Sequence, residues 1–305
     1  MWITSSPTTA LTPTAVALGN FDGIHLGHRQ VIAPVLDNDG QSRATVVTFS
    51  PHPKEFFSGE PRSLLTPQEE KVLYLEEIGV EQLVLLPFNR ELASLTPQQF
   101  VEEILVNQLQ ARQVSVGADF CFGYKRTGNA EVLKAIAATF GISVTIVPLL
   151  KFHGTRISSS AIREALLSGQ LHPANRMLGR SYRLIGQVVT GQQIGRTIGF
   201  PTANLQLLAD KLVPCHGVYG VRVSGVGTEP ILGVMNIGNR PTVNGLSQTL
   251  EVHLLDWSGD LYGQTITVEL EEFIRPEQRF ASLEDLKAQI HADCETARTA
   301  LTAIS

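Results

Sequence analysis

The chain has 305 residues, of which 43% are hydrophobic and 17% charged, and its formal net charge is −5. This length is enough for two ordinary domains, and the balance is that of a globular protein. Lys and Arg number 14 up to Gly179 and 10 after it, against 16 and 13 Asp and Glu. Neither part is basic, which argues against a nucleic-acid partner.

The three cysteines, Cys121, Cys215 and Cys294, are far apart and form no CxxC pair. They therefore predict neither a zinc site nor a disulfide framework, and they fit a reducing compartment. The first basic residue is Arg29, so the N-terminus lacks the charged start of a signal peptide. No apolar run reaches membrane-spanning length. We expect a cytoplasmic protein without a membrane partner.

Up to about residue 168, short apolar runs alternate with helical patterns. Thr66 and Thr96 each precede a proline and stand three residues before a Glu or Gln, which predicts two helices with threonine N-caps. Gly79 and Gly141 stand where glycines end helices. Such alternation predicts a parallel sheet covered on both faces. The predicted strands are Thr14–Leu18, Ala44–Phe49, Gln82–Pro87, Gln113–Val116 and Ser143–Val147.

After Gly179, strand-like runs follow one another with glycine and proline turns and no helical pattern between them. This predicts an antiparallel barrel or sandwich, and hence domains over residues 1–179 and 180–305. A capping-box pattern at Ser282 predicts a final helix that runs toward Leu301. The predicted strands are Tyr182–Thr190, Gly217–Val223, Pro230–Ile237, Gln248–Leu254 and Thr265–Phe273.

The first segment with chemical content is Leu18–His28, LGNFDGIHLGH, which follows the first predicted strand and opens a helix. In such a turn, the spacing of His25 and His28 brings both imidazoles to one side, beside backbone N–H groups. Two histidines and a helix N-terminus can bind a triphosphate and stabilise the charge that develops on it. The alternatives are two surface histidines, or a metal site without a third His or Cys nearby in sequence.

A second segment, Gly154–Arg163, has the sequence GTRISSSAIR. Its three consecutive serines precede Arg163 by about one helical turn, so hydroxyls, backbone N–H groups and a guanidinium could all face one phosphate. Serines at a helix start more often only cap it. Because ligands bind at the carboxyl ends of parallel strands, we expect the two segments to meet at that edge of the sheet.

In the C-terminal part, Gly191–Thr197 has a superficial likeness to a P-loop. Its spacing is one residue short, arginine replaces lysine, and no parallel strand precedes it. The following residues Thr202 and Asn204 place a hydroxyl and an amide two residues apart in a loop stiffened by proline. Neutral oxygens of this kind suit a magnesium ion that carries phosphates. A simple turn is the alternative.

The N-terminal segments, with Pro51-His52-Pro53 and Gly117–Gly123, resemble the nucleotidyltransferase superfamily. Within it they resemble the FMN adenylyltransferase half of bacterial bifunctional FAD synthetases. The resemblance implies a Rossmann-like domain in which His25, His28 and Arg163 act on ATP phosphates. It implies nucleotide contacts from Gly19, Asn20, Phe21, Gly27, Ser158, Ser159 and Ser160, and flavin contacts from Pro51, His52, Pro53, Asp119, Phe120 and Phe122. Without it, Asp119–Gly123 could equally be a strand-end loop with two core aromatic residues.

The C-terminal segments resemble riboflavin kinases, in GRTIGFPTANL, Gly217–Val221, Asn236–Thr242, Glu251–Asp256 and Arg275–Phe280. That family's fold is a six-stranded antiparallel barrel with a terminal helix. The resemblance implies ATP as co-substrate and Mg²⁺ held by Thr202 and Asn204. It also implies nucleotide contacts from Gly195, Gly199, Pro201, Thr202 and Asn204, and a flavin contact from Arg275.

Kinase chemistry needs a base, because the 5′-hydroxyl of riboflavin is a weak nucleophile. Glu251 alternates with His253 on one face of a predicted strand, and Val252 and Leu254 take the other. The strand pattern alone allows a solvent-facing glutamate, but the resemblance makes Glu251 the expected general base. His253 is expected to be structural.

The sequence thus predicts an enzyme that phosphorylates riboflavin to FMN and then adenylylates FMN to FAD, releasing pyrophosphate. One alternative is an FMN adenylyltransferase with an inactive, flavin-sensing barrel, against which the intact Thr202, Asn204 and Glu251 argue. Another is a non-catalytic regulator that binds ATP or flavin, against which the intact His25, His28 and Arg163 argue.

Overall fold

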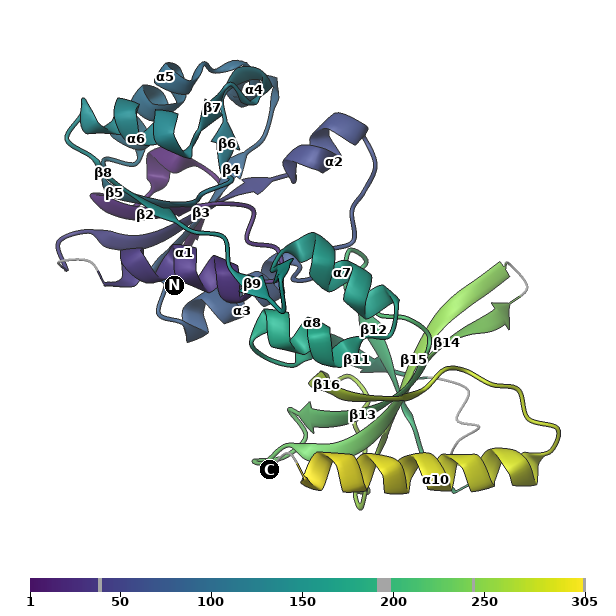
Figure 1. The fold of residues 1–305 in the computed structure, drawn as a ribbon. Helices are drawn as coiled ribbons and strands as arrows, with labels where there is room; N and C mark the ends of the chain where they lie inside the picture. Colours follow the sequence, from purple (N-terminus) through teal and green to yellow (C-terminus); the bar gives the residue numbers. More distant parts are fainter. Residues whose placement is uncertain (38–39, 191–198, 243–244, 304–305) are drawn as a thin grey trace. The chain divides into compact units, whose positions relative to one another are not determined.

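The computed structural model describes residues 1–37, 40–190, 199–242 and 245–303. The chain divides into two compact units, Met1–Ser159 and Ser160–Ser305 (Figure 1). Among the described residues, no helix has the length and apolarity needed to cross a membrane.

The first unit is built on a parallel sheet of six strands in the order β1-β4-β3-β2-β5-β8. From β2 the chain moves outward through β3 and β4, and then starts β5 on the other side of β2. Such a reversal leaves a crevice outside the carboxyl ends of the two strands that flank it, here β2 and β5. The strands are β1 (Trp2–Thr4), β2 (Thr14–Leu18), β3 (Arg43–Ser50), β4 (Gln82–Pro87), β5 (Ala111–Gly117) and β8 (Ser143–Val147).

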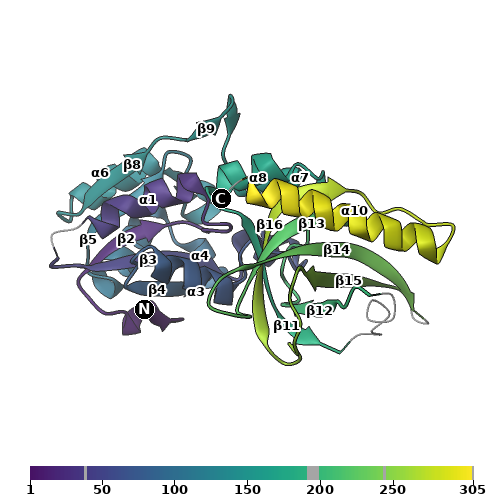
Figure 2. The same cartoon turned by 90° about the horizontal axis from the view of Figure 1, so that it is seen from below.

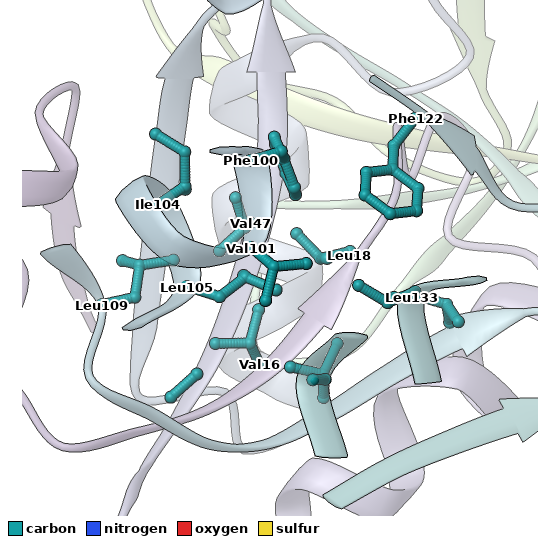
Figure 3. Close-up of a cluster of buried hydrophobic side chains, with 14 of the residues drawn as sticks. Val16, Leu18, Val47, Phe100, Val101, Ile104, Leu105, Leu109, Phe122 and Leu133 are labelled. Carbon is teal, nitrogen blue, oxygen red and sulfur yellow. The ribbon is translucent and has the colours of Figure 1, made fainter. Parts of the chain in front are cut away.

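Helices cover both faces of this sheet, because successive residues of a buried strand point to opposite faces. Val16 and Leu18 of β2 pack with residues of η2 and α6 in one core (Figure 3), whereas Ala15 and Ala17 pack with α1 and α3 in another. Figure 1 shows these two helix layers on opposite sides of the sheet, and Figure 2 shows the same unit from the side of α1 and α3. The helices are η1 (Pro7–Thr9), α1 (Leu26–Leu36), α2 (Pro53–Ser58), α3 (Gln68–Glu77), α4 (Arg90–Ser94), α5 (Pro97–Gln99), the π-helical η2 (Phe100–Gln108), η3 (Tyr124–Arg126) and α6 (Ala130–Ala138).

All five predicted strands of this unit are present, and β2, β4 and β8 have the predicted bounds. Two small hairpins were not predicted: β6 (Cys121–Phe122) with β7 (Gly128–Asn129), and β9 (Lys151–Phe152) with β10 (Thr155–Arg156). The edge strand β1 lies in an N-terminal segment for which the sequence indicated no structure. The Thr96 capping box is confirmed.

The predicted N-cap at Thr66 is wrong. Helix α3 begins after Pro67, without a side-chain cap. The Thr66 hydroxyl instead accepts a hydrogen bond of 2.5 Å from the backbone N–H of Gly23, in the turn after β2. The hydroxyl oxygen that the local pattern predicted to cap the helix is therefore used in a tertiary contact.

The second unit contains a closed antiparallel barrel in the order β11-β12-β15-β14-β13-β16. Alternate residues such as Met235, Val252 and Val268 are fully buried or nearly so, which is the strand pattern of a filled barrel. The five predicted strands are present, and the sixth, β12, lies where the sequence indicated a loop. The strands are β11 (Tyr182–Val189), β12 (Ala203–Leu207), β13 (Gly217–Ser224), β14 (Ile231–Thr242), β15 (Gly245–Leu254) and β16 (Thr265–Arg275).

The terminal helix α10 (Leu283–Thr302) packs on strands β13 and β14 through Cys294, Ala297 and Leu301. The Ser282 hydroxyl caps it by accepting from the Asp285 N–H, as predicted. Helices α7 (Ser159–Leu167) and α8 (Leu171–Leu178) precede the barrel in the chain. The Asn175 side chain of α8 donates to the Leu270 carbonyl of β16 and accepts from the Tyr182 N–H of β11.

Candidate active sites

The turn after β2 brings His25 and His28 together at the start of α1. Their rings are stacked, with centroids 3.6 Å apart and planes 14° from parallel. His25 is the N-cap residue and is 5% exposed, and its Nδ1 accepts from the His28 N–H at 3.2 Å. Because Nδ1 accepts, a neutral His25 carries its proton on Nε2 and can donate from that atom. A side chain on Gly27 would meet the His25 ring at 3.3 Å, which explains the glycine between the two histidines.

The backbone of this turn is strained. Phe21 and Ile24 have positive φ angles of 47° and 38°, which side chains rarely adopt. Each side chain is only 1% exposed and packs in the core beneath α1. Burial of two large apolar side chains offsets a strain of about 1–3 kcal/mol per residue. The core thereby sets the path of the turn that carries both histidines.

Neighbouring elements also hold this turn by hydrogen bonds. The Asn20 carbonyl accepts from the Thr48 hydroxyl of β3 at 2.9 Å and from the Lys71 ammonium of α3 at 3.1 Å. The Asp22 carbonyl accepts from the Ser159 hydroxyl at 2.8 Å. Lys71 is buried, and burial lowers its pKa, against which the charge of Asp22 acts. Sequence analysis missed Lys71, because a helical pattern does not separate a buried lysine from an exposed one.

His52 lies among cationic side chains at the end of β3. Burial lowers its pKa from 6.5 to about 4, and the positive charges of Arg62, Lys71 and Lys54 add to the shift while Asp22 opposes it. Its Nδ1 accepts from the Lys54 N–H as the N-cap of α2. The ring is therefore neutral at pH 7, in surroundings that favour an anion.

An aromatic cluster follows Pro51-His52-Pro53. Phe88 meets Phe49, Phe56 and Phe57 edge to face, with ring centroids 5.3–5.8 Å apart. Phe57 is 72% exposed, which is unusual for a residue of its size. No sequence pattern indicated a site at these residues. An exposed ring on a supported aromatic cluster offers a flat apolar surface to a planar ligand.

The loop after β5 carries the other predicted flavin contacts. The Asp119 carboxylate accepts a hydrogen bond from the Arg156 guanidinium of the β9–β10 hairpin. Phe122 is buried in the core against Phe100, whereas the half-buried Phe120 stacks on it. Of the two rings, Phe120 has more surface available to a ligand. Ser158 and Ser159 are half-buried, and Ser160 and Arg163 lie on α7, which belongs mainly to the second unit.

In the barrel, Glu251 stands in the middle of a polar row. It pairs with Asn204 of β12 on one side and with Asn236 of β14 on the other. Paired residues of antiparallel strands share a face of the sheet, and so do residues two apart on a strand. Asn204, Glu251 and Asn236 therefore share the face opposite the buried Val252, and Thr202 lies two residues before Asn204, just outside the start of β12. Oxygen-bearing side chains in this arrangement suit a hard cation and a carboxylate base.

Two further predicted residues have contacts within the chain. The His253 Nδ1 lies 2.8 Å from the Pro201 carbonyl oxygen. The Arg275 guanidinium binds both oxygens of the buried Asp293 and donates to the Pro276 carbonyl. Gly195 lies outside the described residues, and Gly199 has a φ of +92°. Among the residues the structure describes, no three His, Cys, Asp or Glu side chains gather as a metal site.

Two family models match the chain in order. A model described as FAD synthetase matches residues 8–161, and one described as riboflavin kinase matches residues 178–301. A solved structure described as a macrolide-efflux protein from Streptococcus pneumoniae has a TM-score of 0.87 and 33% identity, covering 97% of this chain and 98% of its own. That likeness supports the fold, and macrolide efflux is a description of that protein alone.

Curated relatives match over nearly the whole chain. The bifunctional riboflavin kinase/FMN adenylyltransferase of Escherichia coli K12 is 45% identical over 287 residues, 93% of this chain and 91% of that protein. The Haemophilus influenzae protein of that name is 42% identical over 288 residues, 93% of each chain. The Bacillus subtilis protein is 37% identical over 293 residues, 93% of this chain and 91% of its own. This chain therefore belongs to the family of bifunctional riboflavin kinase/FMN adenylyltransferases.

Proposed function

We propose that the chain converts riboflavin and ATP to FMN and ADP, and then FMN and ATP to FAD and pyrophosphate. One observation carries the proposal: a single chain holds stacked histidines at the switch point of a parallel sheet and a Glu251–Asn204 pair on a closed barrel. Each lies within the family model for the corresponding activity.

In the first unit, an FMN phosphate oxygen attacks the α-phosphorus of ATP, and the bond to the leaving pyrophosphate breaks. The nucleophile is already an anion, so no base is needed, and positioning and charge stabilisation supply the rate. His25 and His28 donate to phosphate oxygens, and Gly19, Asn20, Phe21 and Gly27 shape the nucleotide site. Ser158, Ser159, Ser160 and Arg163 complete the contacts to the phosphates.

The flavin of the first unit binds beside Pro51, His52, Pro53 and Asp119, with Phe120 and Phe122 as the predicted aromatic contacts. The exposed Phe57 supports this placement and adds a residue to it, because it lies on α2, the short helix that begins at Pro53. A neutral His52 brings no charge to the isoalloxazine ring.

In the barrel, Glu251 takes the proton of the riboflavin 5′-hydroxyl as its oxygen bonds to the γ-phosphorus of ATP and the bond to ADP breaks. Pro201, Gly199 and Gly195 border the nucleotide, and Arg275 is assigned to the flavin end of the site. Thr202 and Asn204 would hold Mg²⁺, which would neutralise phosphate charge when bound; their neutral oxygens and the phosphates form the kind of ligand set it prefers.

The activities are assigned to residues 1–179 and 180–305. We expect the enzyme in the cytoplasm, where ATP is supplied. The test is to incubate the chain with ATP and Mg²⁺, once with riboflavin and once with FMN, and to separate the flavins by chromatography. FAD formed from riboflavin supports the proposal. If riboflavin gives only FMN, the chain is a kinase with an inactive first unit. If FAD forms only from added FMN, the barrel is inactive. If both riboflavin and FMN remain unchanged, the chain is a binding protein.

A further inference from the structure

His253 is two residues beyond Glu251 on β15 and shares its face. Its Nδ1 is 2.8 Å from the Pro201 carbonyl oxygen, and its ring meets Phe200 edge to face at 5.6 Å. A carbonyl oxygen only accepts, so the Nδ1 of His253 must carry the proton in this hydrogen bond. Phe200 packs in turn against the hydrophobic cluster under α10.

The pairing between β12 and β15 explains why a side chain, and not a backbone N–H, bonds the Pro201 carbonyl. Pairing runs through Asn204↔Glu251 to Ala203↔Val252, where it stops. Continued in this register, Thr202 would oppose His253 and Pro201 would oppose Leu254, and Pro201 has no N–H with which to extend the ladder. The imidazole of His253 satisfies the Pro201 carbonyl instead. Thr202 thus lies between Pro201, whose carbonyl is held by His253, and Ala203, which is paired with Val252 in the strand ladder.

We propose that His253 is a positioning residue of the kinase site, which holds Thr202 and Asn204 in register with Glu251. It does so by fixing the Pro201 carbonyl and the Phe200 ring, without touching substrate. The inference rests on the proposed kinase function for its kinetic consequence. Its structural consequence, that the start of β12 is held by a side chain of β15, is independent of any activity.

Two substitutions of similar size separate this role from others. In His253→Asn the amide nitrogen can occupy the place of Nδ1 and donate to Pro201. In His253→Gln the amide lies one bond further out, near the place of Nε2. We expect His253→Gln to raise the KM for Mg·ATP and to lower kcat for FMN formation, together about 3- to 10-fold in kcat/KM, which is the effect of one neutral hydrogen bond. His253→Asn should recover most of this loss.

Amide hydrogen exchange provides the readout that does not depend on activity. Peptides covering residues 199–207 should exchange faster in His253→Gln than in the parent and return toward the parent rate in His253→Asn. Peptides covering β13 should be unchanged in both, which shows that the barrel is folded. Conversion of added FMN to FAD by the same samples should also be unchanged.

Three results would overturn the inference. Equal loss of kinase activity in both variants would assign the ring itself a chemical role. Parent-like exchange at residues 199–207 in His253→Gln would show that the contact does not hold β12. A better rescue by Gln than by Asn would place the working nitrogen at Nε2. If the parent chain makes no FMN, the proposed function fails, while the exchange result still decides the structural claim.

Discussion

At the scale of single residues, Glu251 differs in its neighbours from Glu269, another glutamate of the same barrel. It stands between Asn204 and Asn236, neither of which can neutralise it, whereas Glu269 pairs with Arg183. We predict that Glu251→Gln, which keeps the shape and removes the base, lowers riboflavin phosphorylation by about 10²–10⁴-fold. FMN-to-FAD conversion should persist. Glu269→Gln is the matched control on the same barrel, and near-parent kinase activity in Glu251→Gln would remove Glu251 from catalysis.

His28 provides the reciprocal test in the first unit. It is the third residue of α1, and its ring stacks on that of the N-cap residue His25. We predict that His28→Ala lowers adenylyl transfer by about 10²–10³-fold, mainly in kcat, because the charge that it meets develops as pyrophosphate leaves. Kinase activity should remain, so FMN should accumulate from riboflavin and ATP. Loss of both activities would instead indicate a role in stability.

The lowered pKa of His52 predicts a pH dependence of stability. The unfolded chain binds a proton at this residue near pH 6.5, and the folded chain does so only near pH 4. The contribution of neutral His52 is therefore complete above about pH 6.5 and is lost as the pH falls toward 4. His52→Asn keeps an N-cap acceptor and removes this titration.

The measurement can be confined to the first unit, because the two tryptophans are Trp2 and Trp257. In a Trp257→Phe background, urea unfolding followed by Trp2 fluorescence measures the unfolding free energy of this unit. Between pH 7 and pH 5, this free energy should decrease less in His52→Asn than in its parent. The same loss in both chains would show that His52 titrates normally.

The sequence could predict those residues whose signal is local. The His25–His28 spacing and the alternation of Glu251 with Val252 are local patterns, and the structure places these residues as the patterns predicted. Lys71 and Thr66 could not be found this way, since their partners Asn20 and Gly23 are 51 and 43 residues away. The sequence does not distinguish Phe57 from the other phenylalanines, because its exposure depends on the fold.

At the scale of elements, burial decides which strands the sequence predicts. Strands β2 and β4 are buried on both faces for most of their length, so their bounds follow from continuous apolar runs. Strand β12 has five residues, begins two residues after Pro201 and contains the polar Asn204 and Gln206. Its identity depends on pairing with β11 and β15, which no local pattern contains. The sixth barrel strand was therefore implied by family resemblance alone.

Helix α10 is fastened to the barrel by two ion pairs of different burial. Asp293 is 3% exposed in its pair with Arg275, whereas Asp256 and Arg298 are 73% and 41% exposed. Breaking a buried pair leaves an uncompensated charge, which surface pairs do not. We predict that Asp293→Asn lowers the unfolding free energy of the barrel by about 3 kcal/mol. In a Trp2→Phe background, Trp257 fluorescence reports this unit.

Asp256→Asn is the control, because asparagine tolerates the positive φ of 55° at this position. It should leave the unfolding free energy near that of the parent. Equal effects of the two substitutions would show that Arg275 does not depend on Asp293. An unfolding change in Asp293→Asn that came with normal FMN formation would show that the kinase site does not need the Arg275–Asp293 ion pair.

At the scale of the whole molecule, the position of the division between the two activities can be tested by two cuts. Sequence patterning places the boundary at Gly179, whereas the compact units meet at Ser159 and Ser160. The difference is the pair of helices α7 and α8. They contact the barrel through Asn175 and through the Leu166 carbonyl, which accepts from the Cys215 N–H at 3.1 Å.

We predict that residues 180–305 and residues 160–305 both convert riboflavin to FMN, because Thr202, Asn204 and Glu251 lie within either piece. The longer piece should be more stable, since only it keeps the two Asn175 hydrogen bonds and the packing of α7 and α8. Urea unfolding of both pieces measures the difference, and Asn175→Ala in the longer piece should remove part of it.

The complementary piece 1–179 keeps Arg163 with His25 and His28 and should make FAD from added FMN, whereas 1–159 should not. If 160–305 forms FMN and 180–305 does not fold, the two helices belong to the kinase domain and the boundary moves to residue 159. If neither piece folds, the two activities depend on an intact chain.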